Sequence, residues 1–339
     1  MLGIKMLEYG WMKMMRDRKM DMVARMFKRL GGLLMIGWIS VHGSAAFGTI
    51  GNKAATITVA HRERSLKPGE IILLKARSTQ KLKSLKVEAF DREFPAFEDS
   101  DGLNWSALIG IDLDTKPGGY AIRLNAIDES GKSVTVQKTF WIAPKKFPTR
   151  VLAVDEKFVN PPADEKRRIE EESAKVKAIT ASITPEKLWH GPFRLPVTGE
   201  VISTFGKRSV YNGQPRSPHT GTDFRGNVGT PIRAPNAGRI ALAKDLYYSG
   251  NTIIIDHGFG LYSYLGHMSK FSVSEGDMVK AGDIIGRVGA TGRVTGPHLH
   301  WSVRLVTTQV DPMSLISILG DARRPDIAPA AARKKARGI

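Results

Sequence analysis

Five of the eight histidines in this chain lie between residues 219 and 300. Within that region His219 and Asp223 are four positions apart, and His298 and His300 are two positions apart. Side chains alternate along a β-strand, so each of these motifs presents both of its polar groups on one face. Two neighbouring strands could then bring His219, Asp223 and one or both later histidines to a single metal ion. Imidazole nitrogens with one carboxylate oxygen, and a position left for water, are typical of a catalytic zinc site.

Gly221 lies between His219 and Asp223, and it is expected to leave that strand face open for a ligand. Bound zinc lowers the pKa of its water to about 7 and polarises a carbonyl group. Peptide hydrolysis needs both effects, and it also needs a proton acceptor and donor. The histidine that does not bind the metal, together with His267, is expected to supply these. His257 follows an apolar run and is interpreted as a structural or supporting residue.

The charge balance of the chain is strongly basic, with a formal net charge of +18. Such a surface attracts polyanions, including nucleic acid, anionic lipid and an anionic cell wall. The basic residues follow no recognition-helix, zinc-finger or aromatic RNA-binding pattern, which argues against nucleic acid as the partner. There is no cysteine, so disulfides and thiolate metal sites are excluded.

The first 46 residues have the order of a secretory signal. Arg25, Lys28 and Arg29 precede an apolar run over residues 30–41, and small residues follow at 43–46. This order predicts a signal peptide that is cleaved before Phe47, or a membrane anchor if it stays attached. We therefore expect an exported protein of the periplasm or cell envelope.

The remaining chain divides into four segments. Residues 47–146 contain short alternating runs separated by turn signals, which predicts a β-sandwich of immunoglobulin-like type. Residues 147–195 are expected to form a connector with a helix over 163–181, and 196–320 an all-β domain with many glycine turns. The basic tail, 321–339, is rich in Ala, Pro, Arg and Lys and is expected to be disordered.

Seven segments of the 193–312 region, two of which contain the motifs described above, carry a family resemblance. They are residues 201–208, 217–224, 229–231, 250–258, 266–269, 276–282 and 292–300. Taken together they resemble the lysostaphin-type (LytM-like) zinc endopeptidases of bacterial cell walls. The resemblance implies a β-sheet peptidase domain of the duplicated hybrid motif type, preceded by an accessory sandwich.

This resemblance also implies roles for five residues. His219 and Asp223 would bind Zn²⁺ through a His-x-Gly-x-Asp motif, with His300 as the third ligand. His298 and His267 fall at the two catalytic positions. Relatives usually read Tyr-x-His-Leu around the latter, whereas this chain reads Leu-Gly-His-Met, so packing or substrate contacts there are expected to differ. The implied substrate is the peptide cross-link between peptidoglycan stems, in particular the D-alanyl–diaminopimelate bond.

Two other functions compete with this interpretation. Some relatives have lost metal ligands and serve as non-catalytic, wall-binding activators of other hydrolases, but this chain keeps all five residues. Residues 274–286 also resemble the hammerhead of biotinyl or lipoyl carrier domains. Those domains present a modified lysine at a hairpin tip, and no lysine lies between Asp283 and Arg304.

Overall fold

A computed structural model describes residues 55–99, 101–152 and 162–321 of the chain. The predicted signal segment and nearly all of the predicted disordered tail lie outside these residues. No helix in the described part is both long enough and apolar enough to cross a membrane. The described chain is mostly strand, as the sequence predicts, and a long and a short helix accompany the sheets.

The first seven strands form one continuous antiparallel sheet. Their order is β1-β2-β5-β4-β3-β6-β7. The strands are β1 (Ile57–Glu63), β2 (Ile71–Ser78), β3 (Leu82–Ala89), β4 (Arg92–Glu98), β5 (Asn104–Gly110), β6 (Gly118–Asp128) and β7 (Ser133–Ile142). Strands 1, 2, 5, 4 and strands 3, 6, 7 are the two groupings of a constant-type immunoglobulin sandwich, so this order is compatible with that interpretation, which stays a prediction.

Alternation explains why these residues form strands around a core. In β3 Leu85, Val87 and Ala89 are buried, while Lys86 and Glu88 between them are exposed. In β6 Ile122 and Leu124 are fully buried in the same way. Every second side chain of these strands therefore faces the same apolar core.

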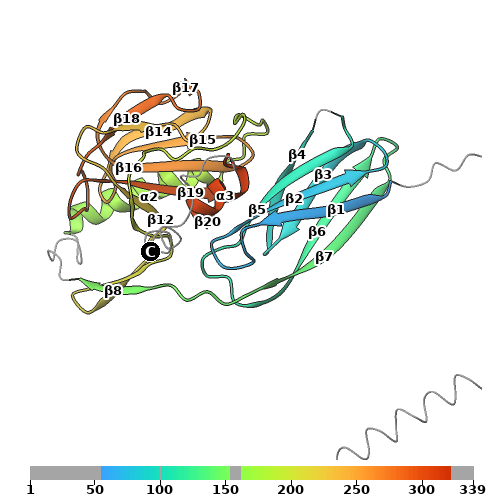
Figure 1. Cartoon of the computed structure of the whole chain (residues 1–339), viewed down its shortest axis with the longest axis horizontal. Coiled ribbons are helices and arrows are strands. Elements are labelled where there is room, and N and C mark those ends of the chain that lie inside the picture. Colours follow the sequence, from blue (N-terminus) through green and yellow to red (C-terminus); the bar gives the residue numbers. More distant parts are fainter. Residues whose placement is uncertain (1–54, 100, 153–161, 322–339) are drawn as a thin grey trace, which may run out of the picture. The chain divides into compact units, whose positions relative to one another are not determined.

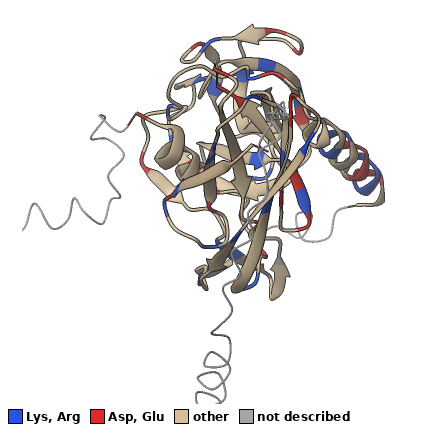
Figure 2. Cartoon of the chain, turned by 90° about the vertical axis from the view of Figure 1, so that its right-hand side faces the viewer, with Lys and Arg blue, Asp and Glu red and all other residues tan. Residues whose placement is uncertain are grey.

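The connector contributes one strand and the long helix. β8 (Thr149–Leu152) pairs in parallel with β10 (Arg208–Tyr211), whose antiparallel partner is β11 (Gln214–Arg216). α2 spans Ala163–Ala181, as the sequence predicts, and begins after Pro162. Figure 2 shows that Lys, Arg, Asp and Glu are mixed along it. Its buried side chains, Val176 and Thr180, lie against the next sheet.

The largest sheet has ten strands, and its main path runs β17-β14-β15-β16-β19-β12-β9. Figure 1 labels β14, β15, β16 and β19 within it. Its strands are β9 (Val201–Ser203), β12 (Gly221–Arg225), β13 (Pro231–Arg233), β14 (Gly238–Leu246), β15 (Gly250–Asp256), β16 (Leu261–Phe271), β17 (Met278–Val279), β18 (Ile284–Val288), β19 (His298–Leu305) and β20 (Thr308–Val310). The short helix α3 (Pro312–Leu319) follows, capped by the Asp311 side chain.

Candidate metal centre

Three adjacent strands carry the polar residues singled out in the sequence. β19 lies between β12 and β16, so that Asp223 is directly opposite His300 on one side and Gly266 is opposite His300 on the other. Directly opposed residues in antiparallel strands share a face. Leu299 and Trp301 point to the other face and are fully buried. The histidines of β19 are thus presented on the face that also carries Asp223.

His219 reaches the same place from the segment just before β12. Its Nδ1 lies 3.0 Å from the backbone carbonyl oxygen of Thr204, and its backbone N–H donates to Lys207. Because a carbonyl can only accept, Nδ1 carries the proton and Nε2 is left to face the site. Metal-binding histidines usually have their second ring nitrogen held in this way.

The three predicted donor atoms form a small triangle. His219 Nε2 and His300 Nδ1 lie 2.9 Å and 2.8 Å from Asp223 Oδ1, and 3.1 Å from each other. Neighbouring ligand atoms of a tetrahedral zinc ion are about 3.3 Å apart, given zinc–nitrogen distances near 2.0–2.1 Å. The triangle therefore fits one face of such a coordination shell to within a few tenths of an ångström.

The charge state of the triangle also suits a cation. Burial opposes the charge of Asp223, but the close approach of the His219 and His300 imidazoles outweighs it and holds the Asp223 pKa well below its usual range. Burial lowers the pKa of His300, which favours the neutral imidazole. An ionised carboxylate beside a neutral imidazole is the form in which these side chains bind metals.

Gly221 has a different role from the one expected. A Cβ atom at this position would lie 2.4 Å from the carbonyl oxygen of Trp301 and 2.7 Å from Cε1 of His300. The space above Gly221 is therefore filled by the His300 ring. The glycine is needed so that a metal-binding side chain can lie flat against β12, which corrects the expectation of a face left open for an outside ligand.

His298 and His267 lie beside the triangle. Their ring centroids are 4.8 Å apart, and the His267 ring is 6.0 Å from that of His300. His298 Nδ1 lies 2.8 Å from the carbonyl oxygen of Gly296, and His267 Nδ1 lies 2.9 Å from that of Thr291. Each Nδ1 must donate to its carbonyl, so each Nε2 is left without a proton. The Nε2 of His298 lies 3.9 Å from Asp223 Oδ1, at the edge of the triangle.

A bulge in β16 directs His267 to the site. Between the pairs Ile253–Leu265 and Asn251–Met268 the strand β16 contains one residue more than β15. Gly266 already occupies the position opposite His300, so regular alternation would turn His267 to the other face. His267 instead has a positive φ of 64°, which is rare for a residue with a side chain. The left-handed backbone brings its ring back to the His298 side.

His267 is also held in its uncharged form. Burial, together with the neighbouring His300 and His298 rings, lowers the pKa of His267 to about 3. Its imidazole is therefore neutral near pH 7. A neutral imidazole with a free Nε2 is able to accept a proton.

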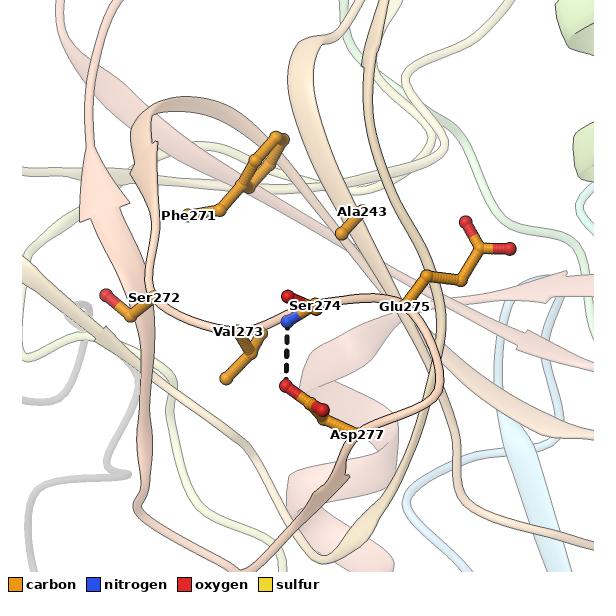
Figure 3. A pocket seen from close by; sticks show the side chains of 7 residues that line it. All are labelled: Ala243, Phe271, Ser272, Val273, Ser274, Glu275 and Asp277. Carbon is orange, nitrogen blue, oxygen red and sulfur yellow. Dashed lines mark hydrogen bonds between the residues drawn. The ribbon is translucent and has the colours of Figure 1, made fainter.

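The hollow that Figure 3 shows belongs to another part of the domain. It is lined by Ala243, residues 271–275 and Asp277, and the backbone N–H of Ser274 donates to the Asp277 carboxylate. Neither the three residues of the triangle nor His267 and His298 line it.

Comparison with known protein families and with curated proteins identifies the region that contains these five residues. Peptidase family M23 matches residues 217–312. The chain is 33% identical over 135 residues to the peptidoglycan DD-endopeptidase ShyB of Vibrio cholerae serotype O1, a match that covers 40% of this chain and 27% of that protein. It is 39% identical over 117 residues to the DD-carboxypeptidase/endopeptidase Mpg of Neisseria meningitidis serogroup B, covering 34% of this chain and 27% of Mpg. The chain thus spans about a quarter of the length of these relatives.

A solved structure extends the likeness to most of the chain. The crystal structure of a putative peptidase M23 from Pseudomonas aeruginosa is 31% identical, with a TM-score of 0.58, and the match covers 74% of this chain and 95% of that one. The chain belongs to peptidase family M23. Peptidases of family M23 depend on zinc, and the donor group of His219, Asp223 and His300 fits that metal.

Sequence reasoning missed the supporting groups of this M23 site. Thr204, Gly296 and Thr291 each act through a backbone carbonyl, which no residue type reveals. Ser249 accepts the His267 N–H through its carbonyl, and its hydroxyl lies 2.5 Å from the Tyr264 hydroxyl. The only signal in the sequence is the unusual glycine at 266, which precedes the left-handed histidine.

His257 lies in the interior of the M23 domain, away from the triangle. It is fully buried, its Nδ1 donates to the carbonyl of Ala237, and its Nε2 lies 2.9 Å from the hydroxyl of Ser263. That hydroxyl is also 3.3 Å from the Trp301 indole nitrogen. These contacts support the interpretation of His257 as a structural residue, because Trp301 follows His300 on β19.

Proposed function

We propose that the chain is a zinc-dependent endopeptidase that hydrolyses peptide cross-links of bacterial peptidoglycan. The observation that carries the proposal is the arrangement of five side chains: a triangle of His219, Asp223 and His300, with the free Nε2 atoms of His267 and His298 beside it. The likeness to ShyB, which is named a peptidoglycan DD-endopeptidase, supports the substrate class.

In this proposal His219, Asp223 and His300 are the metal ligands, and His267 and His298 are catalytic. Zinc held by these residues would lower the pKa of a water molecule and polarise the carbonyl of the scissile bond. One of the two free Nε2 atoms accepts the proton of the attacking water, and the same or the other imidazole returns a proton to the departing amine. The protonated imidazole also stabilises the negative oxygen that develops at the former carbonyl.

The positions of the two catalytic rings suit both tasks. Each ring is fixed by an Nδ1–H bond to a carbonyl, so neither has to reorient as the proton is transferred. The centroid separation of 4.8 Å lets both rings approach one tetrahedral centre from adjacent directions. Both rings lie beside the triangle with Nε2 unprotonated, so either histidine can be the base.

The finer substrate that we propose is the D-alanyl–diaminopimelate cross-link. The test is digestion of purified diaminopimelate-type sacculi by the zinc-loaded chain, with mass spectrometry of the released muropeptides. Loss of cross-linked dimers with a matching gain of monomers is expected, and a His298→Ala preparation should leave the dimers intact. Intact dimers with the zinc-loaded wild-type chain would instead favour the wall-binding activator.

We also propose that the chain acts outside the cytoplasm. The motivation is the order of basic, apolar and small residues before Phe47, which lies outside the described residues. The excess of positive charge would then favour contact with an anionic envelope. Cell fractionation with N-terminal sequencing tests this: a chain recovered in the cytoplasm and still starting at Met1 would contradict it.

A further inference from the structure

Thr291 connects three segments around His267. Its hydroxyl donates to the carbonyl of Met268 over 2.8 Å and accepts the backbone N–H of Asn251 over 2.9 Å. Its own carbonyl accepts the Nδ1–H of His267 over 2.9 Å. One threonine in the loop between β18 and β19 thus contacts the beginning of β15, the bulge of β16 and the side chain of a proposed catalytic residue.

The loops that meet at Thr291 are packed too closely to adjust independently. A Cβ atom at Gly250 would lie 2.2 Å from the Thr291 hydroxyl oxygen, and one at Gly292 would lie 2.3 Å from the Gly250 nitrogen. Both glycines also have positive φ angles. The Thr291 hydroxyl therefore lies where the backbones of Gly250 and Gly292 touch. It accepts from a backbone N–H of β15 and donates to a backbone carbonyl of β16.

His267 needs such support because its backbone is strained. A left-handed conformation of a residue with a side chain persists only where the surroundings over-determine it. Two bonds hold His267: its N–H donates to Ser249, and its ring donates to Thr291. Ser249 lies in the turn that leads into β15, two residues before Asn251, so the Thr291 hydroxyl joins the segment holding the backbone to the segment holding the ring.

We propose that Thr291 is a positioning residue for proton transfer at His267. Its hydroxyl fixes the loop so that its carbonyl keeps the proton on Nδ1 and leaves Nε2 free toward the site. Without the hydroxyl the carbonyl is free to move, and His267 samples the other tautomer and other ring orientations. The inference deepens the proposed peptidase function and rests on it for the catalytic role of His267.

The test compares three variants of the full zinc-loaded chain. Thr291→Val keeps the shape and removes both hydroxyl bonds, and Thr291→Ser restores them. Thr308→Val is the matched control, because the Thr308 hydroxyl is fully buried and has no hydrogen-bond partner among the described residues. Zinc content, kcat and KM on cross-linked muropeptides, and the His267 tautomer are measured for each. The tautomer is obtained from ¹⁵N spectra of histidine-labelled protein, assigned with a His267→Gln variant.

We expect Thr291→Val to keep its zinc and to lose about tenfold or more in kcat, with little change in KM. The expected loss is smaller than the hundredfold or greater effect of removing a general acid–base group, because the imidazole is still present but less well positioned. Its His267 signal should shift from the Nδ1–H form to a mixture of tautomers. Thr291→Ser should recover both properties, and Thr308→Val should match the wild type.

An unchanged His267 tautomer and an unchanged kcat in Thr291→Val would overturn the proposal. If the valine variant does not fold, Thr291→Cys applies the same test, because a thiol forms only weak hydrogen bonds. The tautomer is measured without substrate. A wild-type chain that cleaves no peptidoglycan would therefore count against the proposed function, while the tautomer would still decide whether Thr291 positions His267.

Discussion

Asp223 on β12 and His300 on β19 are paired directly across two antiparallel strands, with Oδ1 of the carboxylate 2.8 Å from Nδ1 of the imidazole. The pairing is made by the main chain, so the relative position of these two groups does not depend on a flexible loop. His219 approaches the pair from the segment before β12. A metal bound here would be held chiefly by the sheet itself.

Alanine at any one of the three proposed ligands should abolish tight zinc binding. Two protein donors do not complete a zinc site, and the loss should exceed the 10- to 100-fold effect typical of residues that only support a ligand. Zinc affinity is measured by competition with a chelating dye for His219→Ala, Asp223→Ala and His300→Ala. Retention of stoichiometric zinc in all three purified variants would refute the ligand assignment.

His298→Ala and His267→Ala should separate metal binding from turnover. Three other donors remain in each variant, so zinc content and folding should stay close to wild type. Cleavage should fall by about a hundredfold or more, because a proton acceptor or donor is lost. Zinc analysis and single-turnover digestion of cross-linked muropeptides test both halves. If His298→Ala loses zinc while His300→Ala keeps it, the ligand and the catalyst are interchanged.

Gly221→Ala adds only one methyl group, but it should strongly weaken zinc binding. The added methyl group meets the backbone of Trp301 and the His300 ring, and backbone cannot move aside at low cost. Zinc affinity and the melting temperature should both fall. Gly119→Ala in β6 is a suitable control, because its added atom would make only ordinary contacts at 3.5 Å. Wild-type zinc affinity in Gly221→Ala would mean that the His300 ring does not need this position.

His257 should make the fold sensitive to mild acid. Burial lowers its pKa from 6.5 to about 4, so the unfolded chain binds a proton more readily than the folded one. The contribution to stability is complete above about pH 6.5 and is lost as the pH falls toward 4, by about 3 kcal/mol in total. Urea unfolding of chelator-treated protein between pH 7 and 4 measures this. The decline should be shallower in His257→Gln, and identical slopes would contradict it.

Strand alternation was enough to predict part of the site and part of the fold. It places His298 and His300 on one face, because period two is a local property of the chain. It does not account for His219, which lies before β12 and reaches Asp223 from outside the strand. It fails for His267, whose left-handed backbone breaks the period. The fit of His300 over Gly221 also depends on a neighbouring strand, which no local pattern specifies.

The same limit applies to β4, which the sequence did not reveal. Its hairpin with β3 turns through Phe90 and Asp91, both with positive φ angles, where glycine or asparagine usually occurs. A turn without its usual residues is invisible to a pattern search. Pro95 within the strand weakens the signal further. α2, by contrast, follows a proline and is rich in helix-forming residues, and its limits were predicted correctly.

The left-handed backbone of His267 creates a trade-off between stability and activity at one position. Glycine would adopt φ = 64° without the penalty of about 1–2 kcal/mol that a side chain incurs, but it would remove the imidazole. Variants selected only for resistance to heat should therefore accumulate glycine at 267 and become inactive. Variants selected for wall cleavage should keep histidine there and gain their stability elsewhere. The position offers a direct measure of how much stability this domain gives up for an active residue.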